Sequence, residues 1–100
     1  MSEAHEHSDL GTALLQMTFA ALGFDQIVGA LNSQIPGFDW KKILATGTCL
    51  SPVDISQTGS KRSYWLNPSV LAVRLRGMRE FEVADRIELA YSAALISSRA

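Results

Sequence analysis

Cysteine, proline and long hydrophobic runs are all scarce in this sequence. The single cysteine, Cys49, excludes an intramolecular disulfide and supplies no pair of thiolates for a metal ion. The most apolar stretch, residues 10–24, is interrupted by Thr12, Gln16 and Thr18, so it is too short and too polar to cross a bilayer. The beginning of the chain is acidic, whereas a secretory signal begins with a basic region. The sequence therefore predicts a cytoplasmic protein.

Recognisable catalytic machinery is also missing. The sequence contains no glycine-rich phosphate loop, no zinc-binding spacing and no nucleophile elbow. Cys49 has no histidine base near it in sequence, because the only histidines are His5 and His7. These two would need a rigid backbone to hold a metal, and a polar terminus does not provide one. We therefore expect no enzymatic activity, no cofactor and no metal site.

The composition is that of one small globular domain. Of the 100 residues, 47% are hydrophobic and 19% are charged, which allows a single buried core. We expect a mobile tail over residues 1–8 and one helical domain over residues 9–100. Ser8 or Asp9 is placed to cap the first helix. Apolar residues between positions 13 and 22 cover nearly all sides of that helix, which is typical of a helix buried centrally.

A short motif occurs twice after this helix. Gly23-Phe24-Asp25 and Gly37-Phe38-Asp39 are fourteen residues apart. Glycine can end a segment in a left-handed conformation, and aspartate is a favoured N-cap of the helix that follows. The motif therefore predicts helices near residues 25–33 and 39–46, each capped by its aspartate.

The strongest helical signal lies in the last third of the chain. Asn67 is a good N-cap and Pro68 fits the first helical position, so a helix is predicted from there to a break at residues 77–79. A second, amphipathic helix follows. Its wide apolar face consists of residues at helical spacing: Val83, Ala84, Ile87, Ala90, Tyr91, Ala94 and Leu95.

The connection between residues 47 and 65 allows two interpretations. Ser51 and Pro52 are suited to open a short helix, which is the interpretation we favour. Alternatively, residues 53–55 pair with residues 64–66 as a hairpin across Thr58-Gly59-Ser60. The predicted fold class is therefore all-α, a compact bundle of about five helices with one long irregular connection, in which a short hairpin is the alternative.

Charge is distributed in blocks along the chain. Residues 1–40 carry a formal charge of −5, residues 41–79 carry +6 and residues 80–100 carry −2. Such blocks either give the molecule two faces of opposite charge or neutralise each other across the fold.

The last helix offers candidate residues for binding a protein partner. Helical phase places Phe81, Leu89 and Ile96 away from the main apolar face and beside acidic residues. Either a second layer covers these side chains, or they form a mixed apolar and acidic strip that suits a partner with a basic surface. The candidate partner-binding residues are Phe81, Glu82, Asp85, Glu88 and Leu89, together with the aromatic residues Tyr64 and Trp65.

A helix-turn-helix that binds DNA is the alternative interpretation of the same stretch. Two helices joined by a short turn near Gly77 suit such a motif. The candidate phosphate contacts are Lys61, Arg62, Arg74, Arg76 and Arg79. Against it, the second helix opens with Glu80-Phe81-Glu82, and these carboxylates would be repelled by a phosphate backbone.

From Met-Ser-Glu-Ala-His-Glu-His to Ala-Leu-Ile-Ser-Ser-Arg-Ala, the chain resembles the small phage-encoded anti-CRISPR proteins that inhibit type I-F surveillance complexes. The resemblance concerns the whole chain, its single-domain size and its lack of catalytic residues, because such inhibitors share no common motif. It implies that the protein binds Cas protein subunits of a guide-RNA complex in the host bacterial cell and blocks the loading or unwinding of target DNA. Some such inhibitors are strongly acidic DNA mimics, whereas this chain has a net charge of −1 and offers only local acidic patches.

Overall fold

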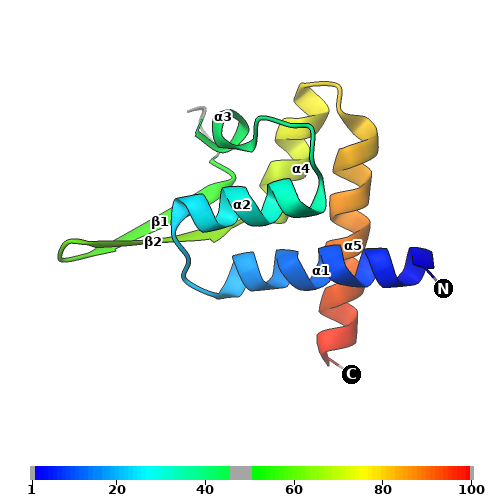
Figure 1. Cartoon of the computed structure of the whole chain (residues 1–100), viewed down its shortest axis with the longest axis horizontal. Helices are drawn as coiled ribbons and strands as arrows, with labels where there is room; N and C mark the ends of the chain where they lie inside the picture. The colour runs from blue at the N-terminus through cyan, green and yellow to red at the C-terminus, as the bar shows by residue number, and fades with distance from the viewer. Residues whose placement is uncertain (1, 46–50, 100) are drawn as a thin grey trace.

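The computed structural model describes residues 2–45 and 51–99, with side chains from residue 9 to residue 98. These residues form five helices and one hairpin (Figure 1). In chain order the elements are α1 (Ser2–Phe19), α2 (Phe24–Gln34), α3 (Trp40–Ala45), β1 (Val53–Thr58), β2 (Lys61–Leu66), α4 (Pro68–Gly77) and α5 (Phe81–Arg99). The prediction of a mainly helical fold with about five helices is confirmed. The all-α class is corrected by the two-stranded antiparallel sheet.

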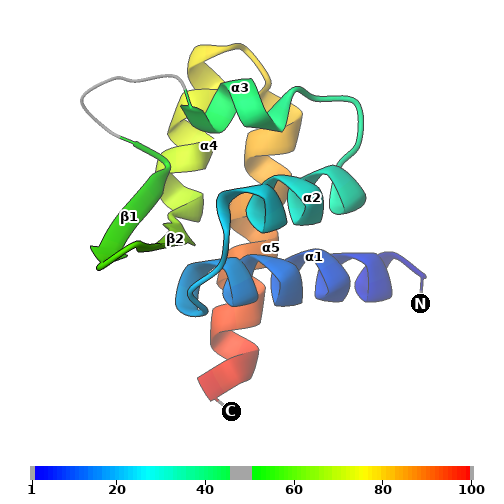
Figure 2. The same ribbon diagram turned by 60° about the vertical axis from the view of Figure 1, so that its left-hand side comes forward.

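The fold is organised around the crossing of α1 and α5, which Figures 1 and 2 show from two directions. Gly11 lies at the crossing. A Cβ atom built there would lie 2.8 Å from the carbonyl oxygen of Ala90 and 2.9 Å from the Cβ of Ala94. The two helices therefore approach more closely than any residue with a side chain would allow.

The hydrophobic core extends from this crossing into the other helices and the base of the hairpin. Trp40 of α3 is buried, and its indole Nε1–H donates a 2.9 Å hydrogen bond to the carbonyl oxygen of Ile35. This bond satisfies the one polar atom of the ring. The main buried side chains are Leu10, Leu14 and Met17 of α1, Ile27 and Leu31 of α2, Ile43 and Leu44 of α3, Leu71 and Leu75 of α4, and Ala84, Ile87 and Ala90 of α5.

The connection before α4 is a hairpin, so the short helix that we favoured is wrong. β1 and β2 pair antiparallel with Val53 opposite Leu66 and Asp54 opposite Trp65, the pairing of the alternative interpretation. The Ser51 hydroxyl does not cap a helix: it accepts from the N–H of Val53 and donates to the carbonyl oxygen of the same residue. Gly59 has φ 63°, which supplies the left-handed residue that a two-residue hairpin turn requires.

Helix boundaries follow the predicted capping only in part. The Asn67 carboxamide accepts from the N–H of Val70, and Asp39 accepts from the N–H of Lys42, so both act as predicted N-caps. The N-cap of α2, however, is Gly23, whose N–H donates to the Gln26 side chain at 2.7 Å. Asp25 lies instead in the first turn of α2, where a carboxylate is still favourable to the helix dipole.

The first helix also differs from its prediction. It begins at Ser2, whereas Ser8 or Asp9 was the predicted start. It is not buried on all sides: Leu14 and Met17 lie in the core, but Phe19 is 66% exposed. Only one face of α1 is therefore buried, and the apolar Phe19 at its C-terminal end is exposed to solvent.

The crossing predicts opposite effects for two helical glycines. Gly11→Ala is expected to lower the free energy of unfolding by about 1–3 kcal/mol, because the new methyl group meets the backbone of α5. Gly29→Ala in α2 is the matched control, since nothing lies within 4 Å of its built Cβ. It should raise the free energy of unfolding by about 0.5–1 kcal/mol. Urea unfolding measures both, and a neutral Gly11→Ala would contradict the close approach.

Candidate protein-binding face of α5

The side of α5 that faces away from the core carries large apolar residues in solvent. Phe81 is 56% exposed, Leu89 is 65% exposed and Ile96 is 71% exposed. We call this face, with Asp85, Glu88 and Ser92 between its apolar residues, the α5 strip. Among the described residues no second layer covers it, which settles the alternative that the sequence left open.

Arg76 of α4 connects the basic and acidic blocks of the sequence. Its guanidinium forms an ion pair of 2.8 Å with Asp85 and a second ion pair with Glu88. The hydrogen bonds that the guanidinium donates to Asp85 and, second in effect, to Glu88 raise the pKa of Arg76 above its usual value. Two carboxylates against one guanidinium leave this part of the α5 strip with a net negative charge. The two blocks therefore partly neutralise each other across the fold at this point.

The remaining candidates for partner binding lie at different distances from the α5 strip. Glu82 is exposed on the first turn of α5, at the edge of the strip. Tyr64 and Trp65 are half-buried in β2. The Tyr64 ring meets Phe24 edge to face at 5.5 Å, and its backbone exchanges two hydrogen bonds with Leu22. Neither aromatic residue of β2 thus forms part of the α5 strip.

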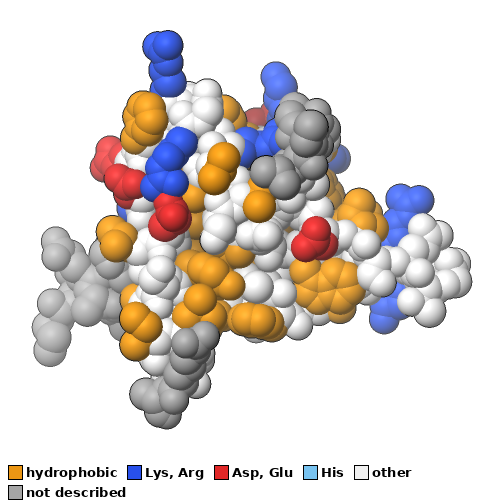
Figure 3. All heavy atoms as spheres, turned by 180° about the vertical axis from the view of Figure 1, so that it is seen from behind, with side chains coloured by type: hydrophobic (Ala, Val, Ile, Leu, Met, Phe, Trp, Pro, Cys, Tyr) orange, Lys and Arg blue, Asp and Glu red, His pale blue; other side chains and the backbone are white. Residues whose placement is uncertain are grey.

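The basic candidates for binding nucleic acid are spread over separate places. Lys61 and Arg62 are exposed near the tip of the hairpin, which projects from the helical body (Figure 1). Basic side chains extend from both sides of this hairpin in the view from behind (Figure 3). Arg76 is paired with two carboxylates of α5. Arg79 belongs to the turn between α4 and α5, and Figure 1 shows this turn and the hairpin tip at different ends of the molecule.

The turn between α4 and α5 contains a feature that the sequence did not indicate. The N–H of Glu80 bonds to the carbonyl oxygen of Leu75 at 2.8 Å, and the N–H of Arg79 bonds to that of Arg76 at 3.0 Å. These are the two bonds of a Schellman motif, whose left-handed residue is usually glycine. Here that residue is Arg79, with φ 64°, and not Gly77. No local sequence pattern distinguishes this arginine from an ordinary surface residue.

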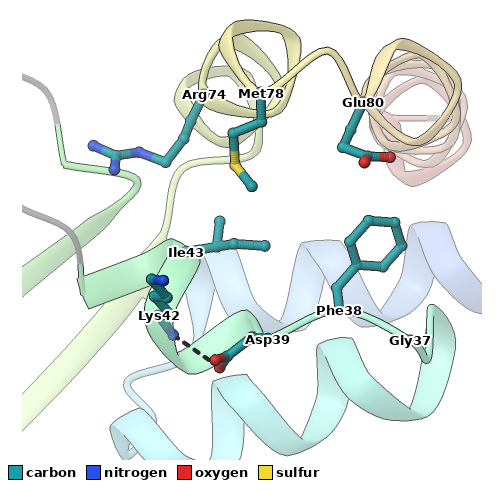
Figure 4. A pocket seen from close by; sticks show the side chains of 8 residues that line it. All are labelled: Gly37, Phe38, Asp39, Lys42, Ile43, Arg74, Met78 and Glu80. Carbon is teal, nitrogen blue, oxygen red and sulfur yellow. Dashed lines mark hydrogen bonds between the residues drawn. The ribbon is translucent and has the colours of Figure 1, made fainter.

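An open pocket of about 480 Å³ lies beside this turn (Figure 4). The sequence did not predict this pocket either. Phe38, Ile43 and Met78 provide its apolar surface. Its charged residues are Asp39, Lys42, Arg74 and Glu80. Because the pocket joins α3 and its preceding turn to the end of α4, its parts are far apart in the sequence.

In the parts of the chain that the structure describes, no group of three or more His, Cys, Asp or Glu side chains is placed to hold a metal ion. Cys49 lies outside those residues. No helix of residues 2–45 or 51–99 is long and apolar enough to cross a membrane. Comparisons of the chain with protein-family models, with curated proteins and with solved structures find no match.

The left-handed conformation of Arg79 predicts that glycine at this position gives a more stable protein than alanine does. Arg79→Gly should have a free energy of unfolding about 1 kcal/mol above that of Arg79→Ala, because glycine adopts positive φ without a steric penalty. Both variants lose the same charge, so their difference isolates the backbone contribution. Thermal unfolding should show a difference of about 4–8 °C. Equal midpoints would contradict the left-handed conformation at this residue.

Proposed function

We propose that this protein is a non-enzymatic inhibitor that binds a type I-F CRISPR-Cas surveillance complex and sterically blocks the binding of target DNA. Its partners would be Cas protein subunits, in the cytoplasm of the bacterial host. The α5 strip would provide the docking surface. The resemblance of the whole chain to phage-encoded inhibitors of this class suggests the particular complex, and the chemistry of the strip supports a partner of this kind.

The observation that carries the proposal is the exposure of Phe81, Leu89 and Ile96 along one face of α5. Scattered apolar residues on a surface need no explanation, but three in line on one helix face form a coherent docking surface. Exposed apolar side chains gain free energy when a partner covers them, at about 25 cal/mol per Å².

The acidic residues of the strip select the type of partner. Asp85 and Glu88 in the strip and Glu82 at its edge present carboxylates beside the apolar residues. Arg76 pairs with both Asp85 and Glu88 but supplies a single positive charge against their two negative charges. A surface that binds DNA is rich in Lys and Arg, because these residues neutralise phosphates. Such a surface is electrostatically complementary to the α5 strip, so the protein would occupy positions that DNA would otherwise contact.

A pull-down against purified type I-F complex tests the proposal, with binding expected at micromolar concentration or below. Leu89→Ser should weaken binding by about tenfold, since a central apolar contact is typically worth more than 1 kcal/mol. Val73→Ser is the matched control, because Val73 is 60% exposed on α4 and lies outside the α5 strip. Its affinity should stay within about twofold of the unmodified protein. Absence of binding at micromolar concentration would reject the proposal.

A small DNA-binding regulator of the helix-turn-helix type is the second candidate. It is favoured by the three-residue connection between α4 and α5 and by exposed Lys61 and Arg62 on the hairpin. The pairing of Arg76 with Asp85 and Glu88 argues against it, because a guanidinium held by two carboxylates is already compensated.

Arg76→Gln separates the two candidates by the direction of its effect. If the α5 strip binds a basic partner, removing the guanidinium makes the strip more negative, and affinity for the complex should rise or stay the same. If the protein binds DNA through this arginine, affinity for DNA should fall and the salt dependence should become weaker. Pull-down and gel-shift titrations at two salt concentrations measure the two outcomes. A loss of complex binding would contradict the role given to the strip.

A further inference from the structure

The pocket beside the α4–α5 turn lies outside the α5 strip, and its apolar and charged residues are unevenly distributed. Met78 is 48% exposed, and in Figure 4 its side chain extends toward Ile43 across the opening. Phe38 closes one end, on the same side as the carboxylate of Glu80 (Figure 4). At the other end, the guanidinium of Arg74 is directed away from Phe38 and Glu80. The pocket thus has an apolar middle and an anionic, aromatic end.

The two acidic residues of the pocket differ in their engagement. Asp39 is a helix cap, because its carboxylate accepts from the backbone N–H of Lys42. The backbone of Glu80 takes part in the Schellman motif and in the first turn of α5. Its side chain, by contrast, has no hydrogen bond or ion pair with any residue in the described ranges 2–45 and 51–99. Glu80 is therefore the carboxylate that is available to a ligand.

The aromatic ring next to Glu80 is held in place from behind. Phe38 packs against Trp40 with ring centroids 5.3 Å apart, and Trp40 itself is fixed by its hydrogen bond to Ile35. On the other side the backbone of Met78 is held at the end of α4, because its N–H bonds to carbonyl oxygens of that helix. The Phe38 ring and the buried Ile43 are thus supported by the core, so this part of the apolar surface is already ordered before a ligand binds.

We infer that this pocket is a binding site for a basic side chain of a protein partner, an aliphatic stem that ends in a cation. The stem of a lysine or arginine would lie along Met78 and Ile43, and its cation would meet the Phe38 ring and the Glu80 carboxylate. Aromatic rings and carboxylates both attract cations, and long basic side chains bury their stems against apolar surface. The identity of the partner rests on the proposed function, but the pocket and its ligand chemistry do not.

The test uses N-acetyl-lysine amide as the probe and the Met78 methyl resonance as the readout. We expect the Met78 methyl signal to shift in a saturable way as the probe is added to about 50 mM, a range suited to the few kcal/mol that one side chain contributes. The Met17 methyl is the internal reference, because Met17 is buried in the core. N-acetyl-norleucine amide, which has a similar stem without the charge, should bind at least about threefold more weakly.

Two variants assign the charge effect to its residue. Glu80→Gln should weaken binding of the lysine probe by about threefold or more, because it removes the available carboxylate and keeps the side-chain length. Asp54→Asn is the matched control, since Asp54 is an exposed carboxylate on β1 outside the pocket, and its variant should bind the probe as the unmodified protein does. N-acetyl-arginine amide should behave like the lysine probe.

Three results would overturn the inference. They are a Met78 shift no larger than that of Met17, an equal response to the norleucine probe, or a preference for N-acetyl-glutamate amide, which would assign the pocket to anions through its basic end. Because the probes are small molecules, these results are independent of the surveillance complex. If the protein binds the complex but the probes do not bind the pocket, only the inference about the pocket is rejected. If the probes bind the pocket but the protein does not bind the complex, only the proposed function is rejected.

Discussion

The close crossing of α1 over α5 at Gly11 is the constraint on which the rest of the structure depends. With no side chain at this residue, the backbone of α1 lies directly against Ala90 and Ala94 of α5. This contact commits one side of α5 to the core and leaves the opposite side to solvent. The exposed positions of Phe81 and Leu89 are therefore a consequence of the same geometry that stabilises the fold.

The charges are arranged around this division. Arg76 reaches from α4 to Asp85 and Glu88, so it joins two helices, and its own positive charge is compensated by these carboxylates. What remains on the strip is apolar and acidic. That combination suits a protein surface rich in Lys and Arg better than a phosphate backbone, which is why an inhibitor of a DNA-handling complex is favoured over a DNA-binding regulator.

Features set by local chemistry were predictable from the sequence only in part, since Gly23 and not the predicted Asp25 is the N-cap of α2. Features set by long-range contacts were not predictable. Asn67 and Asp39 were identified as caps because their function depends on the next three residues alone. The choice between helix and hairpin after residue 50 depended on pairing across the Gly59 turn, and local capping signals favoured the wrong one.

The candidate site shows the same limits. Helical phase placed the residues of the α5 strip together, but whether another helix covered them depended on the crossing at Gly11. Only the distribution of charge in blocks along the sequence suggested that Arg76 pairs with acidic residues of α5. Left-handed Arg79 had no signal, because arginine is uncommon at such positions. The pocket of Phe38 and Met78 joins parts of the chain that only the tertiary fold brings together.

The most direct test of the central claim, that the protein occupies the DNA-binding surface of its target, is an order-of-addition measurement. Labelled target DNA is added to purified type I-F complex either before or after the protein, and the DNA bound is measured by fluorescence anisotropy. We expect that the protein added first prevents DNA binding at equimolar amounts, and that DNA added first prevents binding of the protein. Simultaneous binding of DNA and protein to one complex would contradict it.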